Sequence, residues 1–213
     1  MGEMGLRERK KQRMYQDVSD IAVRLFLERG FDAVSVAEVA AAAGISKPTL
    51  FRYFPAKEDL VLHRIADHET EAARVVAGEA DPVDALRRHF LAGLERRDPV
   101  TGLNDHPGVL AFHRLLYGTP SLVARAYAHQ ERSEAALAEA LGGDLAARLA
   151  AAQIIAVQRV LALENWRRIA AGEPVAEVAP DAVAAAERAF RRLAQGLPGC
   201  GASERDSVKN VTR

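Results

Sequence analysis

The chain has 213 residues, of which 49% are apolar and 27% charged, a balance that is ordinary for a folded protein and excludes disorder along its whole length. Lysine plus arginine and aspartate plus glutamate both total 29, so the molecule as a whole has no basic excess that would attract nucleic acid. The single cysteine, Cys200, excludes a disulfide framework and a cysteine-based metal site.

The N-terminus carries five basic residues and one acidic residue between Arg7 and Arg13. Such a cluster can neutralise DNA phosphates, although most clusters of this kind are simply solvated. No clean apolar segment follows it, so the pattern is not that of a secretory signal and we expect a cytoplasmic protein.

Signals for β-strands are scarce, because β-branched and aromatic residues rarely alternate with polar ones, and alanine and leucine dominate. We therefore expect an all-α protein. From Val18 to Phe26 the apolar residues recur at the spacing that lines one face of a helix. Gly30 follows as the residue that commonly ends a helix, so the first helix is predicted to stop there.

Two shorter helices are predicted next. Ser35 and Glu38 have the spacing of a capping box, which marks a helix start. Gly44 permits a tight turn, and Ser46 can cap a third helix whose first turn tolerates Pro48. In that third helix we expect an apolar side made of Leu50, Phe51 and Phe54, and an outward side made of Lys47, Thr49, Arg52 and Tyr53.

Two short helices joined by a glycine-containing turn and preceded by a supporting helix form the helix-turn-helix arrangement. A helix fits the major groove of DNA, where each base pair presents a distinct pattern of donors and acceptors. The polar residues of the predicted third helix suit this function. Spacing alone leaves a second interpretation open, namely a tight three-helix core whose polar surface has no DNA to bind.

The remainder of the chain is predicted to be a helical bundle. A long helix leads away from Lys57, and prolines and glycines divide the segment from Asp81 to Gly196 into amphipathic helices. The first domain is expected to close near residue 55. Beyond Gly196 too few apolar residues remain for packing, and we expect a disordered tail.

The most apolar stretch runs from Ala146 to Leu163, but four polar residues interrupt it. It falls short of the roughly 20 clean apolar residues that a membrane span requires, so we expect a buried helix and no membrane partner. From Ala146 to Ala171 more than one face is apolar, as a helix that touches both its own core and a partner subunit requires. Together with the segment from Ala182 to Leu193 it is expected to build a four-helix dimer interface.

Three motifs follow one another between residues 25 and 60. They read LFLERGFDAVSV at 25–36, VAAAAGIS at 39–46 and TLFRYFPAKEDL at 49–60. Their order and length resemble the signature of the TetR family of transcriptional regulators. The resemblance implies about nine helices in three parts: a helix-turn-helix domain with a basic arm (1–55), a ligand-binding and dimerisation bundle (56–196) and the tail (197–213).

The same resemblance implies a homodimer that binds double-stranded DNA and is released from a palindromic operator when a small molecule binds. By motif position, the family's DNA contacts correspond to Ser35, Lys47, Pro48, Thr49, Arg52, Tyr53 and Lys57. The family usually has tyrosine at the position of Phe51, so one phosphate hydrogen bond worth roughly 0.5–1.5 kcal/mol is expected to be missing. An arm carrying Arg7, Arg9, Lys10 and Lys11 is a further candidate contact, in the neighbouring minor groove.

The effector is expected to be an acyl-CoA-like or other hydrophobic small molecule, because the N-terminal, FRYFPAKED and RAFRRLAQGL segments resemble an actinobacterial subgroup associated with acyl-CoA-like ligands. A cavity in such a bundle needs polar groups among apolar walls. The candidates are His113 and Tyr117, followed by His106, Phe112, Tyr127, Gln158 and Trp166. Each also has a simpler interpretation as a packing, loop or subunit-interface residue.

An enzyme is not expected. The histidines form no HExxH pair, no serine lies in a GxSxG elbow, and Cys200 lies in the predicted tail. We therefore predict no catalytic residue, no metal and no cofactor. A helical adaptor that has lost DNA binding stays open as an alternative, with some support from Phe51, and it would lack the salt-dependent affinity for duplex DNA that a regulator has.

Overall fold

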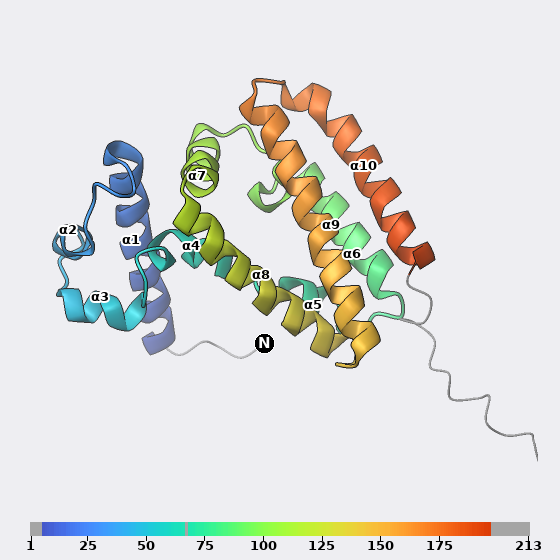
Figure 1. Ribbon diagram of the computed structural model, residues 1–213, viewed down its shortest axis with the longest axis horizontal. Helices are drawn as coiled ribbons and strands as arrows, with labels where there is room; N and C mark the ends of the chain where they lie inside the picture. Colours follow the sequence, from blue (N-terminus) through green and yellow to red (C-terminus); the bar gives the residue numbers. More distant parts are fainter. Residues whose placement is uncertain (1–5, 67, 197–213) are drawn as a thin grey trace, which may run out of the picture. The chain divides into compact units, whose positions relative to one another are not determined.

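The computed structural model describes residues 6–66 and 68–196, and within these ranges it contains ten α-helices, one short 3-10 helix and no strand (Figure 1). The all-α prediction is confirmed. The predicted tail at 197–213 lies outside the described residues. The described residues divide into two compact units, the first with residues 6–66, 68 and 106–129 and the second with residues 69–105 and 130–196.

The first unit is larger than the DNA-binding domain expected at 1–55, because it also includes α4, α7 and the first part of α8. Their bounds, with those of the three N-terminal helices, are α1 (Leu6–Arg29), α2 (Val36–Ala42), α3 (Lys47–Tyr53), α4 (Asp59–Ala66), α7 (Pro107–Gly118) and α8 (Pro120–Ala140). The functional boundary near residue 55 stays a prediction.

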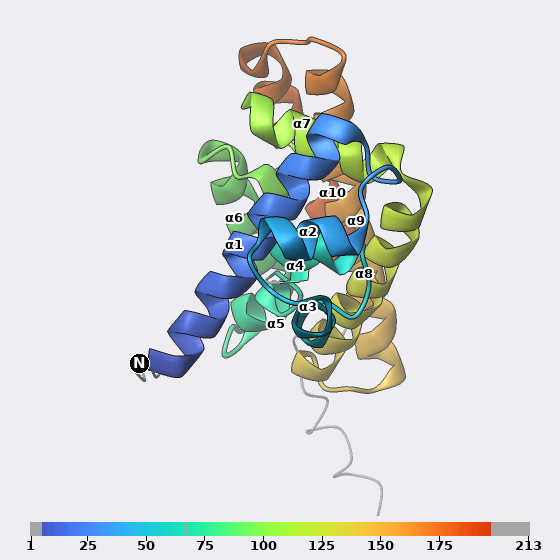
Figure 2. The ribbon, with the colours of Figure 1, turned by 90° about the vertical axis from the view of Figure 1, so that its left-hand side faces the viewer.

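The core of the first unit forms where α1, α2, α3 and α4 turn their apolar sides toward one another. Figure 2 views the ribbon from the side of these helices. Phe26 of α1, Leu50 of α3 and Leu60 of α4 are at most 1% exposed. Leu116 and Leu122 add the apolar sides of α7 and α8 to the same cluster. Packing of this kind, and not helix propensity, stabilises helices as short as α2 and α3, which have seven residues each.

The ends of the short helices are fixed by the predicted caps. Ser35 Oγ accepts the Glu38 N–H at 3.2 Å while the Glu38 carboxylate accepts the Ser35 N–H at 2.8 Å, so the capping box is confirmed. Ser46 Oγ accepts the Thr49 N–H at the start of α3. Gly44 has φ of 67°, the left-handed conformation that the tight turn before α3 requires.

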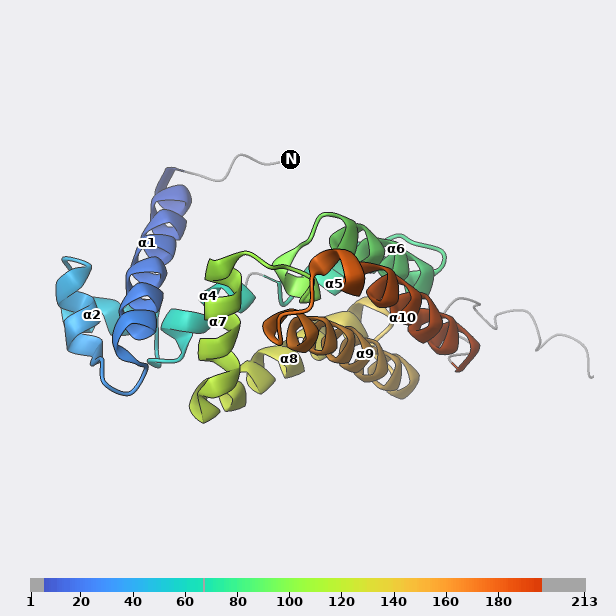
Figure 3. The same cartoon turned by 90° about the horizontal axis from the view of Figure 1, so that it is seen from above.

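The second unit contains α5 (Glu71–Val76), α6 (Pro82–Glu95), the 3-10 helix η1 (Pro99–Thr101), the end of α8, α9 (Leu145–Ala170) and α10 (Val175–Gly196). Helix α10 packs against both α6 and α9 (Figure 3). Phe90 and Phe190 meet in this core with ring centroids 6.0 Å apart. Next to η1, Gly102 lies so close to α9 that a Cβ atom there would overlap the carbonyl oxygen of Ala162.

The long helix expected after Lys57 is interrupted, which accounts for one helix more than expected. Helix α4 ends at Ala66 and α5 begins at Glu71. The segment between them includes His68 and Thr70, which are weak helix formers. Across this break Glu69 accepts two hydrogen bonds from Arg132 of α8, at 2.9 and 3.0 Å.

Helix α9 is, within the described ranges, the one helix long and apolar enough to cross a membrane by length and composition alone. The prediction that this segment falls short of a span is therefore wrong for the full helix. The prediction that this helix is buried is also wrong for the single chain. Only 22% of the most apolar 18-residue stretch of α9 is buried. The physical reason is that only one side of α9 meets its own unit, which leaves Leu145, Leu149 and Val160 between 54% and 66% exposed.

Candidate DNA-binding interface

Helix α3 has one buried and one exposed side. Leu50 is fully buried and Phe54, directly after the helix, is 2% exposed. The opposite side carries four exposed residues, namely Lys47, Pro48, Phe51 and Arg52. The exposed side faces away from the core of the first unit, so it is available to a partner.

Two predictions about the sides of α3 are wrong. Phe51 was expected in the core but is 40% exposed, whereas Tyr53 was expected to face outward but is half-buried. The reason is the 100° turn per residue: position 51 turns away from Leu50, while position 53 returns to nearly the same side. The Tyr53 ring packs edge-on against Tyr15 of α1 at a centroid distance of 5.2 Å.

The two cations of α3 lie over neighbouring rings. Lys47 Nζ is 5.8 Å from the centre of the Phe51 ring, and the Arg52 guanidinium is 5.1 Å from the centre of the Tyr53 ring. Arg52 also donates a hydrogen bond of 3.3 Å to the Tyr53 hydroxyl. Contacts of this kind limit the range of positions that the two long side chains adopt. Both charges remain at the exposed surface.

Thr49 and Pro48 belong to the first turn of α3. The Thr49 hydroxyl lies 2.8 Å from the Ser46 hydroxyl, within hydrogen-bonding distance of the residue that caps the helix. Pro48 occupies a position where the missing N–H has no helical partner to lose. The first turn is thus held by its own contacts before any DNA is present.

Ser35 and Lys57 lie outside α3 and both have partners within the chain. Ser35 is engaged in the capping box of α2. Lys57 donates from Nζ to the Phe31 carbonyl oxygen at 2.5 Å and lies 4.3 Å from the centre of the Phe31 ring. The sequence pattern did not indicate this internal role for Lys57.

The capping box also carries a charge. The pKa of the Glu38 carboxyl falls to about 2, chiefly because the carboxylate accepts the Ser35 N–H and also because it is paired with Arg29 at 2.7 Å. Glu38 is therefore ionised at neutral pH. The ionised carboxylate is the form that accepts both hydrogen bonds and keeps the start of α2 in place.

The predicted N-terminal arm has a helical backbone, because α1 begins at Leu6 and includes positions 7, 9, 10 and 11. Their side chains lie outside the described part of the structure. An arm made of these residues is thus a continuation of α1 and not an extended strand of chain.

Two residues that support α3 were missed by the sequence analysis. Tyr15 of α1 contacts Tyr53 and Phe54, and the His63 ring of α4 stacks on Tyr15 with centroids 5.0 Å apart and an interplanar angle of 18°. Tyr15 continues the apolar stripe of α1 one turn before Val18, and this spacing could have identified it. No signal in the sequence identifies His63, because its contact joins two separate helices.

The ligand-binding candidates do not gather in one unit. Five lie in the first unit (His106, Phe112, His113, Tyr117 and Tyr127), and two lie on α9 in the second unit (Gln158 and Trp166). Along α7 the rings of Phe112, His113 and Tyr117 follow one another at centroid distances of 5.9 and 6.0 Å. His106 caps α7 through Nδ1, which accepts the Gly108 N–H at 3.1 Å. Tyr127 is 51% exposed.

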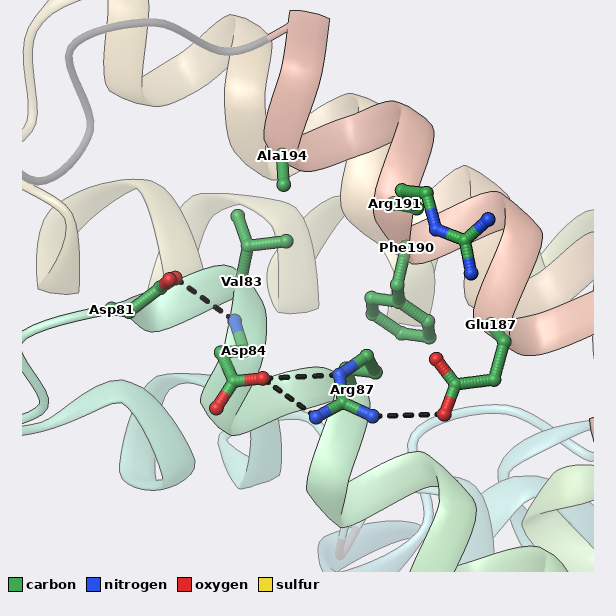
Figure 4. Close-up of a pocket in the computed structure, with 8 residues that line it drawn as sticks. All are labelled: Asp81, Val83, Asp84, Arg87, Glu187, Phe190, Arg191 and Ala194. Atoms are coloured by element: carbon green, nitrogen blue, oxygen red, sulfur yellow. Dashed lines mark hydrogen bonds and ion pairs between the residues drawn. The ribbon is translucent and has the colours of Figure 1, made fainter.

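Two hollows of the described structure are lined by other residues. One, of about 310 Å³, lies between α1 and the α2–α3 turn and is lined by Met14, Val18, Ile21 and Ile45 among others. The other, of about 200 Å³, lies between α6 and α10 (Figure 4). In it Arg87 donates to both Asp84 and Glu187, which raises the Arg87 pKa and ties the two helices together. Neither hollow includes a predicted ligand-binding residue.

The fold and the exposed side of α3 define a DNA-binding transcriptional regulator of the helix-turn-helix type. Residues 19–63 match the family model described as bacterial regulatory proteins, tetR family. The chain is 33% identical over 177 residues to the HTH-type transcriptional regulator TcmR of Streptomyces glaucescens, and this alignment covers 77% of the chain and 78% of that protein. The chain therefore belongs to the tetR family.

Other similarities concern part of the sequence or, for solved structures, the fold alone. The HTH-type transcriptional regulator EthR of Mycolicibacterium smegmatis is 41% identical over 73 residues, which cover 32% of this chain and 33% of that protein. A TetR-family regulator from Streptomyces coelicolor superposes with a TM-score of 0.58 at 21% identity, covering 91% of this chain and 99% of that structure. Native NalD of Pseudomonas aeruginosa superposes with a TM-score of 0.55 at 20% identity, covering 85% of this chain and 96% of that structure.

Family membership decides two further predictions. Regulators of this family bind DNA and typically act as dimers with small-molecule effectors. They are regulators and not enzymes, and the same holds for this chain.

Proposed function

We propose that this chain is a cytoplasmic repressor that binds a palindromic operator as a homodimer and is released when a hydrophobic small molecule binds. The observation that carries the proposal is the exposed side of α3, where Lys47 and Arg52 remain at the surface while Leu50 and Phe54 anchor the helix in the core. A rigid helix with outward cations can enter the major groove and meet both phosphates and base edges.

Each predicted contact residue has a chemically suitable group. Lys47 and Arg52 supply the charges that neutralise phosphates or pair with guanine O6 and N7. Thr49 and Tyr53 supply hydroxyl groups, and Pro48 offers a small apolar surface. Ser35 and Lys57 are proposed to meet the phosphates beside the helix, with Lys57 exchanging its contact to the Phe31 carbonyl oxygen for a phosphate oxygen.

The dimer is proposed to form through α9 and α10. Leu145, Leu149 and Val160 of α9 and Val183 of α10 are exposed in the single chain, which supports their being covered by a second copy. A two-fold axis would present two copies of α3 to half-sites about 34 Å apart.

The effector is proposed to be acyl-CoA-like or another hydrophobic molecule, held by the candidates of α7. His113, Tyr117 and Phe112 offer neighbouring rings with a few polar atoms, which suits an apolar ligand with one polar anchor. Binding would favour a conformer with low operator affinity, and that affinity would fall by the difference between the ligand's affinities for the two conformers. Gel-shift titrations with and without palmitoyl-CoA test this step, since a ligand that binds yet leaves the DNA complex unaltered contradicts it.

DNA recognition is tested with the purified full-length protein. Duplexes are selected from a random pool, and the affinity for the selected operator is then measured at several salt concentrations. Lys47→Ala and Arg52→Ala should each weaken binding and reduce the slope of log K against log salt by about one per lost phosphate contact. Arg114→Ala, which removes an exposed cation on α7, is the matched control. It should leave the operator affinity and the salt slope unchanged. A chain that selects no duplex would be the adaptor, and the proposal would fail.

A further inference from the structure

Phe51 differs from the other phenylalanines of the chain. All seven lie in the described part of the structure; Phe26, Phe31, Phe54, Phe90 and Phe190 are buried, and Phe112 is half-buried. Phe51 alone among them is exposed, with 40% of its surface open to solvent. An exposed phenyl ring leaves apolar surface in water, which is unfavourable unless another molecule covers it.

The position of Phe51 identifies the partner that would cover it. The ring does not belong to the apolar cluster of the first unit, to which α3 contributes Leu50 and Tyr53. It lies one helical turn after Lys47, whose Nζ is 5.8 Å from its centre, and next to exposed Arg52. An exposed apolar ring beside the Lys47 ammonium group faces the same partner as that cation, and in a DNA-binding regulator that partner is the duplex.

The chemistry of the ring limits what it can contact there. A phenyl group has no hydrogen-bond donor or acceptor, so it gains nothing from a phosphate oxygen or from the polar edges of guanine, cytosine and adenine. The largest apolar group that a base presents in the major groove is the C5 methyl group of thymine. The minor groove presents no such group.

We propose that Phe51 contacts the C5 methyl group of one thymine in each operator half-site and so makes that thymine a determinant of operator choice. This inference rests on the proposed function, in which α3 enters the major groove.

The test uses the full-length protein and the operator selected from random duplexes. Each thymine is replaced in turn, in both half-sites, by deoxyuridine, which pairs identically with adenine and lacks only the methyl group. For the wild type, one thymine position should be sensitive, with affinity falling about fourfold per half-site, the factor expected for one methyl-sized group no longer withdrawn from water. In Phe51→Ala the same replacement should have no effect.

Two variants serve as controls. Phe51→Tyr keeps the ring and should keep the deoxyuridine penalty. Leu27→Ala removes a side chain of α1 that is 42% exposed, close to the exposure of Phe51, and should also keep the penalty. Circular dichroism and thermal unfolding verify that each variant is folded, as expected for substitutions outside the buried core.

The outcomes separate this inference from the function on which it rests. If the wild type tolerates deoxyuridine at every position, or if the penalty survives in Phe51→Ala, thymine reading by Phe51 is overturned. If at the same time Lys47→Ala and Arg52→Ala lose operator binding, the major-groove role of α3 still stands. A chain that selects no duplex overturns both.

Discussion

His113 shows how one partly buried side chain makes stability depend on pH. Burial lowers its pKa to about 4, against 6.5 for an exposed histidine. As pH falls below 6.5 the unfolded chain takes up this proton while the folded chain resists it, so the contribution of His113 is complete above pH 6.5 and is lost toward pH 4. Between pH 7 and 5 the wild type should lose roughly 2 kcal/mol of unfolding free energy through this residue.

The measurement is urea unfolding of the wild type and of His113→Gln at pH 7 and at pH 5. The variant, which has no group that titrates at this position, should lose less stability over this interval. At pH 5 and above, the capping box does not affect the comparison. The contribution of Glu38 to stability is present above pH 4.5 and is lost only as the pH falls toward the Glu38 pKa of about 2. Equal losses in both proteins would contradict the assignment.

Lys57 is expected to have two roles, and its structural role can be measured without DNA. Its ammonium group donates to the Phe31 carbonyl oxygen and lies over the Phe31 ring. Lys57→Met should therefore lower the unfolding free energy by about 1 kcal/mol in the absence of DNA. Lys47→Met is the matched control, because Lys47 is exposed and its loss should change stability by less than about 0.5 kcal/mol. A Lys57→Met protein as stable as the wild type would leave Lys57 with a DNA role alone.

At the scale of elements, α8 carries two arginines that each hold an acidic residue of the α4–α5 segment. Arg125 donates two hydrogen bonds, of 2.8 and 2.9 Å, to the Asp59 carboxylate, and Arg132 holds Glu69 in the same way. The hydrogen bonds from Arg125 to Asp59 raise the pKa of the Arg125 guanidinium. Asp59 additionally accepts the Ala56 N–H, so the Arg125 pair fixes the start of α4.

Replacing Arg125 by lysine should therefore loosen the start of α4, since an ammonium group cannot form two parallel bonds to one carboxylate. A double-mutant cycle with Arg125→Lys and Asp59→Asn, followed by urea unfolding, should give a coupling energy of roughly 1 kcal/mol, because the pair is partly exposed and solvent screens it. Arg132 and Glu69 provide a parallel cycle in the second unit. Strictly additive changes in the first cycle would show that the pair contributes nothing.

The elements that the sequence predicts well are those with signals contained within a few residues. Ser35 with Glu38, and Ser46 with Thr49, are three residues apart, so capping chemistry could identify the starts of α2 and α3. The interruption after Ala66 could not be identified, because it involves Arg132, 63 residues along the chain from Glu69. The sequence predicts the wrong side of α3 for Phe51, because the helical rotation from Leu50, and not the apolar character of the ring, decides which way it faces.

The candidate sites follow the same division. The outward direction of the α3 cations could be predicted, because burying Leu50 in the core leaves a short helix few possible orientations. Residue type alone indicates the ligand-binding candidates, whereas their distribution over two units depends on tertiary packing. Tyr15 and His63, which support Tyr53 and Phe54, are joined by contacts between three different helices.

For the whole molecule, equal numbers of basic and acidic residues leave no general attraction to DNA, so affinity must come from two correctly spaced copies of α3. Dimerisation is therefore expected to decide operator binding. In α9, Leu145, Leu149 and Val160 are 66%, 55% and 54% exposed, and spacings of four and eleven residues place them on one side of the helix. A two-fold partner would bury this stripe against its own copy.

Leu149→Glu should consequently break the dimer, because two carboxylates would be buried near the symmetry axis without partners. Sedimentation velocity at micromolar concentration should give a monomer, and affinity for the full operator should fall toward that for a single half-site. Val100→Glu is the matched control: Val100 lies in η1, is 50% exposed and is outside the stripe, so the variant should remain dimeric and bind normally. A Leu149→Glu protein that sediments as a dimer and keeps its operator affinity would place the subunit interface elsewhere on the chain.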